Sequence, residues 1–483
     1  MMKSPSYSQK HSFCSIVSAL LLAILSSFYA EAQDLSAYKD GEKDAAAAIQ
    51  EAVDSGLGDI RFPKGVYRLS KTITIDLDKV GPTSLSGNGT ARIVMAGAGP
   101  AFRFVGTHEG TAGPGTVKEN VWERQRTPMV DGIEIVGAHP EAGGIEARGT
   151  MQLTVTRTTV REALHGIHLV KRNRNVIISE CHLYNNRGIG VFLDHLNLHQ
   201  INVVNCHISY NKGGGVVVRD TELRNLQIGS CDIEGNMGGP NSKPSANIEI
   251  DSTGINGGEI EIVGCTIQHS HKSPGSTNIL IESKSLKRAF SEEQKDGNIT
   301  ITGNVMSDAQ TNIDIRKTRG LTITGNTMWK GYTYNMIIRG CENFIVSNNV
   351  FDQNPRYGYG DGNQAKLAVL FEDCNGAVIS GNHQRGVGDI PAAFVIRNSR
   401  QINMTDCNIL DYGKVGLLLE NVSDSRVSGC MIRENRKEQK VKAVALRMKG
   451  CKGNMVVNNL LGEIEDIEAG VAKVAGNVAV EKE

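Results

Sequence analysis

Apolar and polar residues alternate over most of the chain in short runs, without helical spacing. One pattern recurs from the middle of the chain to its end. It consists of an apolar, a variable and an apolar residue, then two variable residues, and then an anchor position that holds Cys or Asn. The anchors are Cys181, Cys206, Cys231, Cys265, Asn304, Asn326, Asn349, Asn382, Cys407, Cys430 and Asn459. They follow one another at intervals of 22 to 39 residues, which is typical of a coil that adds one turn per repeat.

A second motif lies between the anchors. It consists of an apolar, a variable and an apolar residue followed by a charged residue, as in Val191 to Asp194. Alternation over three or four residues predicts strands, and the Asn and Gly residues between the motifs predict turns. A single repeat cannot bury its own apolar edge, so the repeats must stack. With about 4.8 Å between neighbouring strands, roughly thirteen coils predict a rod on the order of 60 Å long.

The cysteines follow the same repeat. Six of the ten stand at anchors, and Cys341, Cys374 and Cys451 each precede an anchor by eight residues. Cys14 lies in the amino-terminal segment ahead of the repeats, which leaves nine cysteines. This odd number and the lack of a Cys-x-x-Cys spacing argue against a complete disulfide framework and against a metal cluster. We therefore predict two interior rows of small apolar side chains, with an occasional disulfide between neighbouring coils left open.

The first 32 residues have the features of a secretory signal peptide. Lys3 and Lys10 precede an apolar stretch from Ile16 to Leu25, and a small-x-small cleavage site follows at Ala30 to Ala32. The apolar stretch is too short to span a bilayer comfortably, although a lone membrane anchor is the alternative if cleavage fails. We expect a secreted, periplasmic or extracellular protein without stable membrane insertion.

Composition narrows the class of protein. Lys plus Arg and Asp plus Glu number 52 each, so the formal net charge is zero, which excludes a basic nucleic-acid-binding protein. Aromatic residues make up only 5%, whereas Gly occurs 54 times, and this composition favours a repetitive all-β chain.

A different pattern precedes the repeats. The run from Ala45 to Val53 contains strong helix formers and follows Asp44, a residue type that caps helices. Two strands, Ile60 to Leu69 and Thr72 to Ile75, are predicted around a Pro-Lys-Gly turn. We predict that the helix covers the open end of the stack, whose edge would otherwise recruit other strands.

This segment resembles the amino-terminal cap of the pectate-lyase superfamily, especially its rhamnogalacturonase/epimerase-like branch. The matching residues are Asp40, Gly41, Asp44, Ile49, Gln50, Phe62, Pro63, Gly65 and Tyr67. The resemblance implies an all-β, single-stranded right-handed parallel β-helix with an amino-terminal capping helix. Residues 33–130 would form the cap and first coils, and residues 131–483 the β-helix repeats.

Members of this superfamily are secreted proteins that act on acidic polysaccharides as lyases, hydrolases or epimerases, besides phage tailspikes and non-catalytic members. The polygalacturonase motifs are absent from the sequence. Leu193-Asp194-His195 is only faintly similar to a pectate-lyase motif whose arginine partner motif is missing. The resemblance therefore implies a fold and a substrate class without assigning catalytic residues.

The charged residues that close the second motif stack into one row, and most neighbours in the row have opposite sign. The row contains Asp194, Arg219, Asp251, Glu282, Arg316, Arg339, Glu372, Arg397, Glu420 and Arg447. Such a row is typical of a surface ladder of ion pairs. The alternation breaks where Asp251 adjoins Glu282 and where Arg316 adjoins Arg339.

We take the break as the candidate catalytic site, composed of Glu249, Asp251, Glu282, Asp314 and Arg316. Crowded carboxylates raise a pKa, which suits a general acid, or they bind a hard cation such as Ca²⁺. Either arrangement serves hydrolysis or elimination in a polysaccharide. The alternative is that these residues are part of the solvated ladder.

Two further candidates follow from the same register. His182, His207 and Asp232 stack one above another, so they are secondary candidates for metal binding or proton transfer, with turn-proximal surface groups as the alternative. Aromatic residues cluster in two corresponding turns and, together with Arg339, are predicted to bind substrate. They are Trp329, Tyr332, Tyr334, Tyr357 and Tyr359. Packing of these loops against the rod is the alternative.

Apolar residues also occupy outward positions, among them Leu280, Ile337 and Leu370, so part of that wall should be covered. The candidate covers are residues 284–297, residues 106–129 or a second subunit, which leaves an oligomer open. We expect a carbohydrate-active protein that cleaves or epimerises an acidic polysaccharide, with a non-catalytic glycan-binding or structural rod as the alternative. An open groove at the carboxylates favours the enzyme, and its closure by residues 284–297 favours the rod.

Overall fold

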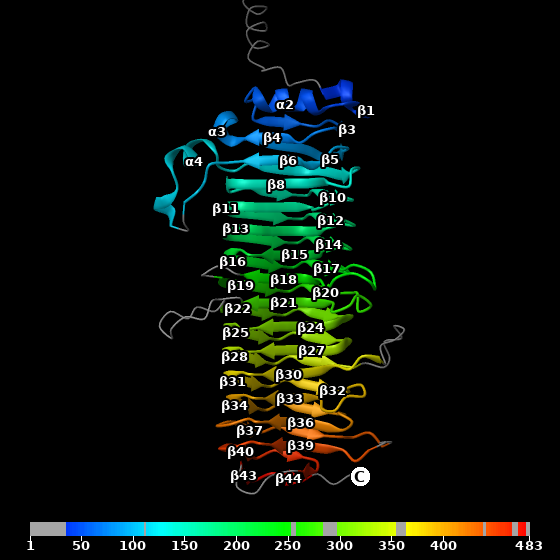
Figure 1. Ribbon diagram of the computed structural model, residues 1–483, viewed down its shortest axis with the longest axis vertical. Helices are drawn as coiled ribbons and strands as arrows, with labels where there is room; N and C mark the ends of the chain where they lie inside the picture. Colours follow the sequence, from blue (N-terminus) through cyan, green and yellow to red (C-terminus); the bar gives the residue numbers. More distant parts are fainter. Residues whose placement is uncertain are drawn as a thin grey trace, which may run out of the picture.

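The computed structural model describes residues 35–110, 113–252, 257–283, 297–353, 364–437, 441–465 and 472–479. The predicted signal peptide, Tyr357, Tyr359 and residues 284–296 lie outside the described residues. Within them, the chain winds into a long rod of parallel strands, capped at its amino-terminal end by a helix (Figure 1). The predicted fold, a right-handed parallel β-helix with an amino-terminal capping helix, is confirmed.

The cap and first strands are η1 (Leu35–Tyr38), β1 (Asp40–Asp44), α2 (Ala46–Asp54), β2 (Asp59–Arg61), β3 (Gly65–Leu69), β4 (Ile73–Asp76), α3 (Leu77–Val80), β5 (Ser84–Met95) and β6 (Gly99–Val105). An insertion with η2 (Pro114–Thr116) and α4 (Glu119–Arg124) follows. Each later coil contributes strands to three faces of the rod, because every strand pairs in parallel with the strand of the next coil.

Face 1 continues through β8 (Ala142–Met151), β11 (Ile167–Ser179), β13 (Ile189–Val204), β15 (Gly214–Arg219), β18 (Ala246–Ser252), β21 (Thr277–Ser283), β24 (Ala309–Arg316), β27 (Gly331–Arg339), β30 (Ala368–Glu372), β33 (Phe394–Arg397), β36 (Val415–Glu420), β39 (Val444–Lys449) and β42 (Ile464–Glu465). Face 2 shares β11 and β13 with face 1, because these long strands turn the corner between the two faces.

The other strands of face 2 are β9 (Thr154–Thr156), β16 (Glu222–Gly229), β19 (Gly258–Val263), β22 (Gly297–Thr302), β25 (Arg319–Thr324), β28 (Glu342–Ser347), β31 (Asn375–Ser380), β34 (Arg400–Thr405), β37 (Arg426–Ser428), β40 (Asn454–Val457) and β43 (Ala472–Ala475). Face 3 contains β7 (Met129–Gly137), β10 (Thr159–Arg161), β12 (His182–Tyr184), β14 (His207–Ser209), β17 (Asp232–Glu234), β20 (Thr266–Gln268), β23 (Val305–Ser307), β26 (Thr327–Trp329), β29 (Val350–Asp352), β32 (His383–Arg385), β35 (Asn408–Leu410), β38 (Met431–Arg433), β41 (Leu460–Leu461) and β44 (Val478–Ala479).

The capping helix α2 lies on the first coil through its apolar side, where Ile49 and Val53 are buried. Its Gln50 side chain forms two hydrogen bonds with the Thr74 backbone, of 2.8 and 2.9 Å, that fix the helix on β4. The Asp44 carboxylate accepts a hydrogen bond of 3.1 Å from the Ala46 backbone at the start of the helix. The predicted position of the helix is therefore confirmed to within one residue at each end.

Cysteine and asparagine side chains form rows inside the rod. The nine described cysteines are buried free thiols, so the two predicted interior rows are confirmed and none of these nine forms a disulfide. Anchor asparagines continue the row, as where Asn326 donates to Asn349 Oδ1 over 3.0 Å. A further row of buried asparagines, which the sequence analysis did not predict, connects Asn186, Asn211, Asn236, Asn247, Asn278, Asn312 and Asn335. These amide ladders satisfy polar groups that the turns bring into the interior.

The insertion between β6 and β7 departs from the repeat and projects from one side of the rod with α4 (Figure 1). Val117 and Val121 pack against Met151 of β8. The Gln125 side chain is fully buried and forms hydrogen bonds of 2.8 Å with Asp78 and with both the backbone and the side chain of Thr107. The insertion is therefore fastened to the first coils. No helix in the described ranges is long and apolar enough to cross a membrane.

Candidate functional site

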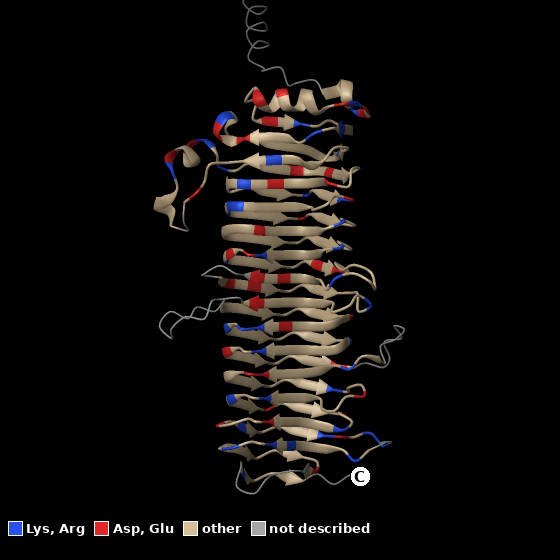
Figure 2. Cartoon of the chain, in the orientation of Figure 1, with Lys and Arg blue, Asp and Glu red and all other residues tan. Residues whose placement is uncertain are grey.

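The predicted carboxylate site lies on face 1, where Figure 2 shows acidic residues gathered around β18 and β21. Asp251, Glu282 and Arg316 occupy equivalent positions on three consecutive strands, as predicted. Glu249 and Asp314 occupy a second row, with Leu280 between them.

Basic side chains neutralise three of these carboxylates. Arg316 binds Asp314 through two hydrogen bonds of 2.6 and 3.0 Å, and its Nη1 lies 3.5 Å from Glu282 Oε2. Lys317 Nζ lies 3.4 Å from the other oxygen of Glu282, and Glu249 pairs with Arg219 at 3.4 Å. The side chain of Asp314 is only 7% exposed. The geometry is that of an ion-pair ladder, and the catalytic role of these residues stays a prediction.

The rest of the charged row follows the predicted register up to Glu420. Arg339 and Arg397 both bind Glu372, over 2.8 and 2.6 Å. Burial alone would raise the pKa of Glu372, but the two guanidinium groups outweigh it and hold that pKa below its ordinary value. At the carboxyl-terminal end the prediction was wrong, because Lys449 and not Arg447 lies beside Glu420.

Three of the predicted aromatic residues, Trp329, Tyr332 and Tyr334, lie at the corner between faces 3 and 1. Tyr332 is 7% exposed, and its ring stacks on that of His271 with centroids 3.7 Å apart. Trp329 ends β26, and the Lys330 ammonium lies 5.4 Å from the centre of its ring. Tyr334 is half-buried against the core. Tyr332 therefore packs against the rod, and sugar binding by the aromatic group stays a prediction.

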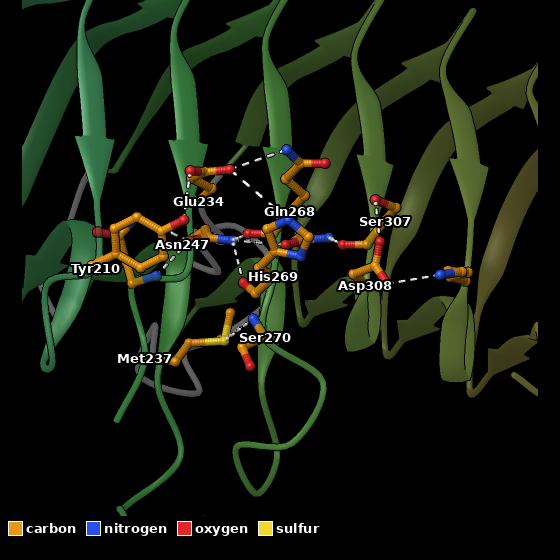
Figure 3. Close-up of polar contacts among 12 residues, drawn as sticks. Tyr210, Glu234, Met237, Asn247, Gln268, His269, Ser270, Ser307 and Asp308 are labelled. Carbon is orange, nitrogen blue, oxygen red and sulfur yellow. Dashed lines mark hydrogen bonds and ion pairs between the residues drawn. The ribbon is translucent and has the colours of Figure 1, made fainter. Parts of the chain in front are cut away.

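Polar side chains connect neighbouring coils at the same corner (Figure 3). Glu234 accepts hydrogen bonds from Tyr210 over 2.9 Å and from Gln268 over 3.1 Å, and its carboxylate lies 3.9 Å from His269 Nε2. Farther along the rod, Lys330 and Asp308 form a largely buried ion pair of 3.4 Å. These contacts are satisfied within the protein and hold the turns in place.

The predicted metal candidates stack on face 3 as expected, since His182, His207 and Asp232 occupy equivalent positions on β12, β14 and β17. The two imidazole rings meet edge to face with centroids 5.0 Å apart. Burial, followed by the neighbouring His207, lowers the pKa of His182, and burial raises the pKa of Asp232. Among the described residues, no group of three or more His, Cys, Asp or Glu side chains is arranged to hold a metal ion.

The most distinctive side-chain arrangement on face 1 joins two histidines through one carboxylate. His168 Nε2 lies 3.1 Å from Asp194 Oδ2, and His195 Nδ1 lies 2.6 Å from Asp194 Oδ1. His195 Nε2 in turn lies 3.2 Å from Asp220 Oδ2. His168 also stacks on Phe192, with ring centroids 5.0 Å apart.

The hydrogen bonds of the shared carboxylate change the pKa of His195 and of Asp194 itself. The hydrogen bond with Asp194 raises the pKa of His195. Burial alone would raise the pKa of Asp194, but its hydrogen bonds with His195 and His168 outweigh it and lower that pKa. The side chains of His168 and Asp194 are about a quarter exposed and that of His195 is mostly exposed, so solvent or a ligand reaches all three. A carboxylate that orients two imidazoles is suited to proton transfer.

The sequence analysis named Asp194 and His195 but did not connect them with His168. His168 pairs with Phe192 in the register, so its contact with Asp194 is diagonal across the outward face. The motif that revealed the charged row requires a charged fourth residue, and the corresponding residue of β11 is Val170. The signal that would have found the pair was the adjacent Asp194-His195 combined with the coil spacing of 25 residues set by Cys181 and Cys206.

Around the corner on face 2, amide side chains line a shallow hollow of about 250 Å³. The lining residues come from β11, β13 and β16 and are Asn175, Ile177, Gln200, Asn202, Asn225 and Gln227. Asn175 donates to Gln200 and Asn202 donates to Gln227, each over 2.6 Å. Planar amides with donors and acceptors beside an exposed Ile are suited to the hydroxyls and the apolar ring face of a sugar.

Comparisons with known proteins agree on the fold. A model of the periplasmic copper-binding protein NosD matches residues 259–474, and a model of the right-handed β-helix region matches residues 111–267. No curated protein sequence matches the chain significantly. The chain is thus a right-handed parallel β-helix, similar to NosD over its carboxyl-terminal part.

The solved structures that match the chain share little sequence with it. The N-terminal fragment of bacteriophage Phi29 gene product 12 is 13% identical with a TM-score of 0.57, covering 92% of this chain and 83% of its own. A mutant tailspike of E. coli bacteriophage HK620, in complex with a pentasaccharide, is 11% identical with a TM-score of 0.52, covering 85% and 75%. The A-module of the Azotobacter vinelandii mannuronan C-5 epimerase AlgE4 is 12% identical with a TM-score of 0.38, covering 93% and 99%.

Proposed function

We propose that the protein is an exported carbohydrate-active β-helix that binds an acidic polysaccharide and cleaves or epimerises it by proton transfer at His168, Asp194 and His195. The observation that carries the proposal is the pair of histidines held on one carboxylate at the outer face of the rod. The name of the NosD family, which describes a periplasmic protein, and the apolar amino terminus support export.

The chemistry of uronates explains why such a group is suitable. Elimination and C5 epimerisation both begin when a base removes the proton from the carbon beside the carboxylate. In elimination a carbon–carbon double bond then forms, the glycosidic carbon–oxygen bond breaks, and the leaving oxygen takes up a proton. In epimerisation a proton returns from the opposite face. A neutral imidazole is the base in either case, and Asp194 orients it.

A cation is needed to neutralise the substrate carboxylate. Arg219 follows Asp194 in the charged row on the next coil, and its side chain is 43% exposed. Its contact with Glu249 is long, at 3.4 Å, so a substrate carboxylate can compete for the guanidinium group. Arg219 thus has a suitable position for binding a uronate next to the histidines.

The proposal is tested by incubating the purified protein with a panel of polyuronates and neutral glycans. Ultraviolet absorbance of unsaturated uronates reports elimination, new reducing ends without it report hydrolysis, and a changed ratio of uronate epimers reports epimerisation. Activity that is lost in His168→Ala and His195→Ala but kept in the distant surface variant Glu420→Gln supports the proposal. Full activity in both histidine variants contradicts it.

The second candidate function is a non-catalytic glycan-binding rod, which the amide-lined hollow favours. The HK620 tailspike with its bound pentasaccharide has the same fold, and this likeness makes an oligosaccharide a reasonable ligand to test. Two results together would identify this function. The protein binds on a glycan array and loses this binding in Asn202→Ala and Gln227→Ala, and no glycan is chemically altered in any of the activity assays. Binding that survives both substitutions would exclude the hollow.

A further inference from the structure

A group of basic side chains lies buried where the β6–β7 insertion covers β11. Arg172 and Arg174 project from the same outward side of β11 and are 8% and 6% exposed. His108, from the insertion, is 1% exposed. His199 lies beside Arg174 on the next strand. Figure 2 shows Lys and Arg on β8 and β11, on the side of the rod from which α4 projects.

Hydrogen bonds within this group fix the direction of its donors. Arg172 Nε donates to His108 Nε2 over 3.5 Å, so the neutral His108 ring carries its proton on Nδ1. That Nδ1 is buried and has no hydrogen-bond partner among the described residues. Arg172 Nη2 and His199 Nδ1 are likewise buried without a described partner. The Arg172 guanidinium group and the neutral His108 ring thus each have a buried N–H group without an acceptor among the described residues.

The charge of Arg172 is also without a partner in the described part of the chain. None of the described carboxylates forms an ion pair with Arg172, and the charge of Glu222 opposes the lowering of the Arg172 pKa by burial and by Arg174 without reversing it. One oxygen of Glu222 already accepts a hydrogen bond of 2.6 Å from Asn197. Burial and then the two arginines lower the pKa of His108 to about 4. A buried cation without a partner is costly, which is why such groups in proteins are usually paired with an anion.

Backbone packing holds the insertion over these residues. The His108 N–H donates to Gly149 O over 3.0 Å, one residue from the buried Thr150. Gly106 lies so close to this strand that a Cβ on it would be 2.1 Å from Gly149 O, so only glycine fits there. The basic group is therefore enclosed by a fastened part of the fold.

From these observations we propose that Arg172, Arg174, His108 and His199 form a binding site for an oxyanion, either free phosphate or sulfate or the carboxylate of an acidic sugar. An oxyanion supplies the acceptors that Arg172 Nη2 and His108 Nδ1 lack and neutralises the Arg172 guanidinium group. The site adjoins the amide-lined hollow, because Arg174 and His199 immediately precede Asn175 and Gln200. The inference does not depend on catalysis at Asp194.

The test is a thermal-unfolding titration of the full chain with phosphate, with sulfate and with an oligogalacturonate, at ionic strength held constant with chloride. Saturable stabilisation by at least one of these ligands is expected. Stabilisation by phosphate or sulfate alone identifies a free oxyanion as the ligand, whereas tighter binding of the oligogalacturonate identifies a sugar carboxylate. Absence of saturable stabilisation by all three overturns the proposal.

Variants connect the effect to these residues. Arg172→Gln should weaken binding roughly tenfold or more, because a charged donor is lost. The exposed Arg319→Gln is the matched control and should bind as the original protein does. If Arg172→Gln does not fold, His108→Gln provides the measurement. With sulfate, whose own charge does not change in this range, the affinity of the original protein should increase as the pH falls toward 5, because a bound anion favours the protonated ring, and this dependence should disappear in His108→Gln. Equal binding by the original protein and either site variant overturns the assignment.

Discussion

His168 and Asp194 meet on adjacent coils of face 1, with His168 Nε2 3.1 Å from Asp194 Oδ2. They are 26 residues apart in the chain, and the second oxygen of Asp194 contacts His195. The stacking of coils thus builds a proton-transfer group from residues of two repeats. The group lies two coils before the carboxylates predicted from the sequence, so substitutions can separate the two sites.

Asp194→Asn should lower the activity on an acidic polysaccharide by about 10²-fold or more, because the two imidazoles lose the group that orients them. The pKa of His195 should also fall, since its hydrogen bond with Asp194 raises it. Initial rates across a pH series measure both effects, with Glu420→Gln as the control. Full activity in Asp194→Asn with loss in Glu282→Gln would move the site to the predicted carboxylates.

The stability of the protein should fall in acid because of His108. Its pKa is lowered from 6.5 to about 4 in the folded protein, chiefly by burial. Below pH 6.5 the unfolded chain takes up a proton that the folded chain does not bind, so the free energy of unfolding decreases between pH 6.5 and about 4. The expected loss is about 2 kcal/mol.

Urea unfolding in chloride buffers at several pH values from 7 down to 4.5 measures this loss. His108→Asn should reduce it, and His165→Asn should act in the same direction, because burial lowers the pKa of His165 to about 4 as well. A pH dependence of stability that is identical in the original protein and in His108→Asn would contradict the explanation.

Features that the coil repeat determines could be predicted from the sequence, whereas contacts that do not follow the repeat could not. The anchors define the coil spacing, so they correctly placed Cys206 and Asp251 in their rows. Arg447 and Lys449 are two residues apart, so both occupy outward positions on the same strand. The pattern alone could therefore not decide which of them lies beside Glu420. His108 lies 64 residues from Arg172 in an insertion that has no repeat, so no periodicity indicated their contact.

The Asp314–Arg316 pair should contribute to stability. Arg316→Gln leaves the carboxylate of Asp314, 7% exposed, without its bidentate partner. Because removing one member of a largely buried pair leaves an uncompensated charge, the expected destabilisation is about 2 kcal/mol. Urea unfolding measures it, with Arg385→Gln as the control, since Arg385 is 62% exposed and its pair with Asp411 should contribute little. Equal stability of the original protein and Arg316→Gln would show that the pair is fully screened by solvent.

The interior asparagine row should matter more to stability than any exposed pair. Asn211 is fully buried, accepts a hydrogen bond of 2.8 Å from Asn186 and donates one of 2.7 Å to Asn236. Asn211→Ala leaves the Asn186 donor and the Leu183 carbonyl without their partner and opens a small cavity. Each buried polar group without a partner costs about 1–3 kcal/mol, so we expect a loss of about 3 kcal/mol in the free energy of unfolding.

Asn202→Ala is the matched control on the surface of the adjoining strand, and its stability should change by less than about 0.5 kcal/mol. Similar unfolding curves for the two variants would show that the buried ladder contributes no more than a surface amide.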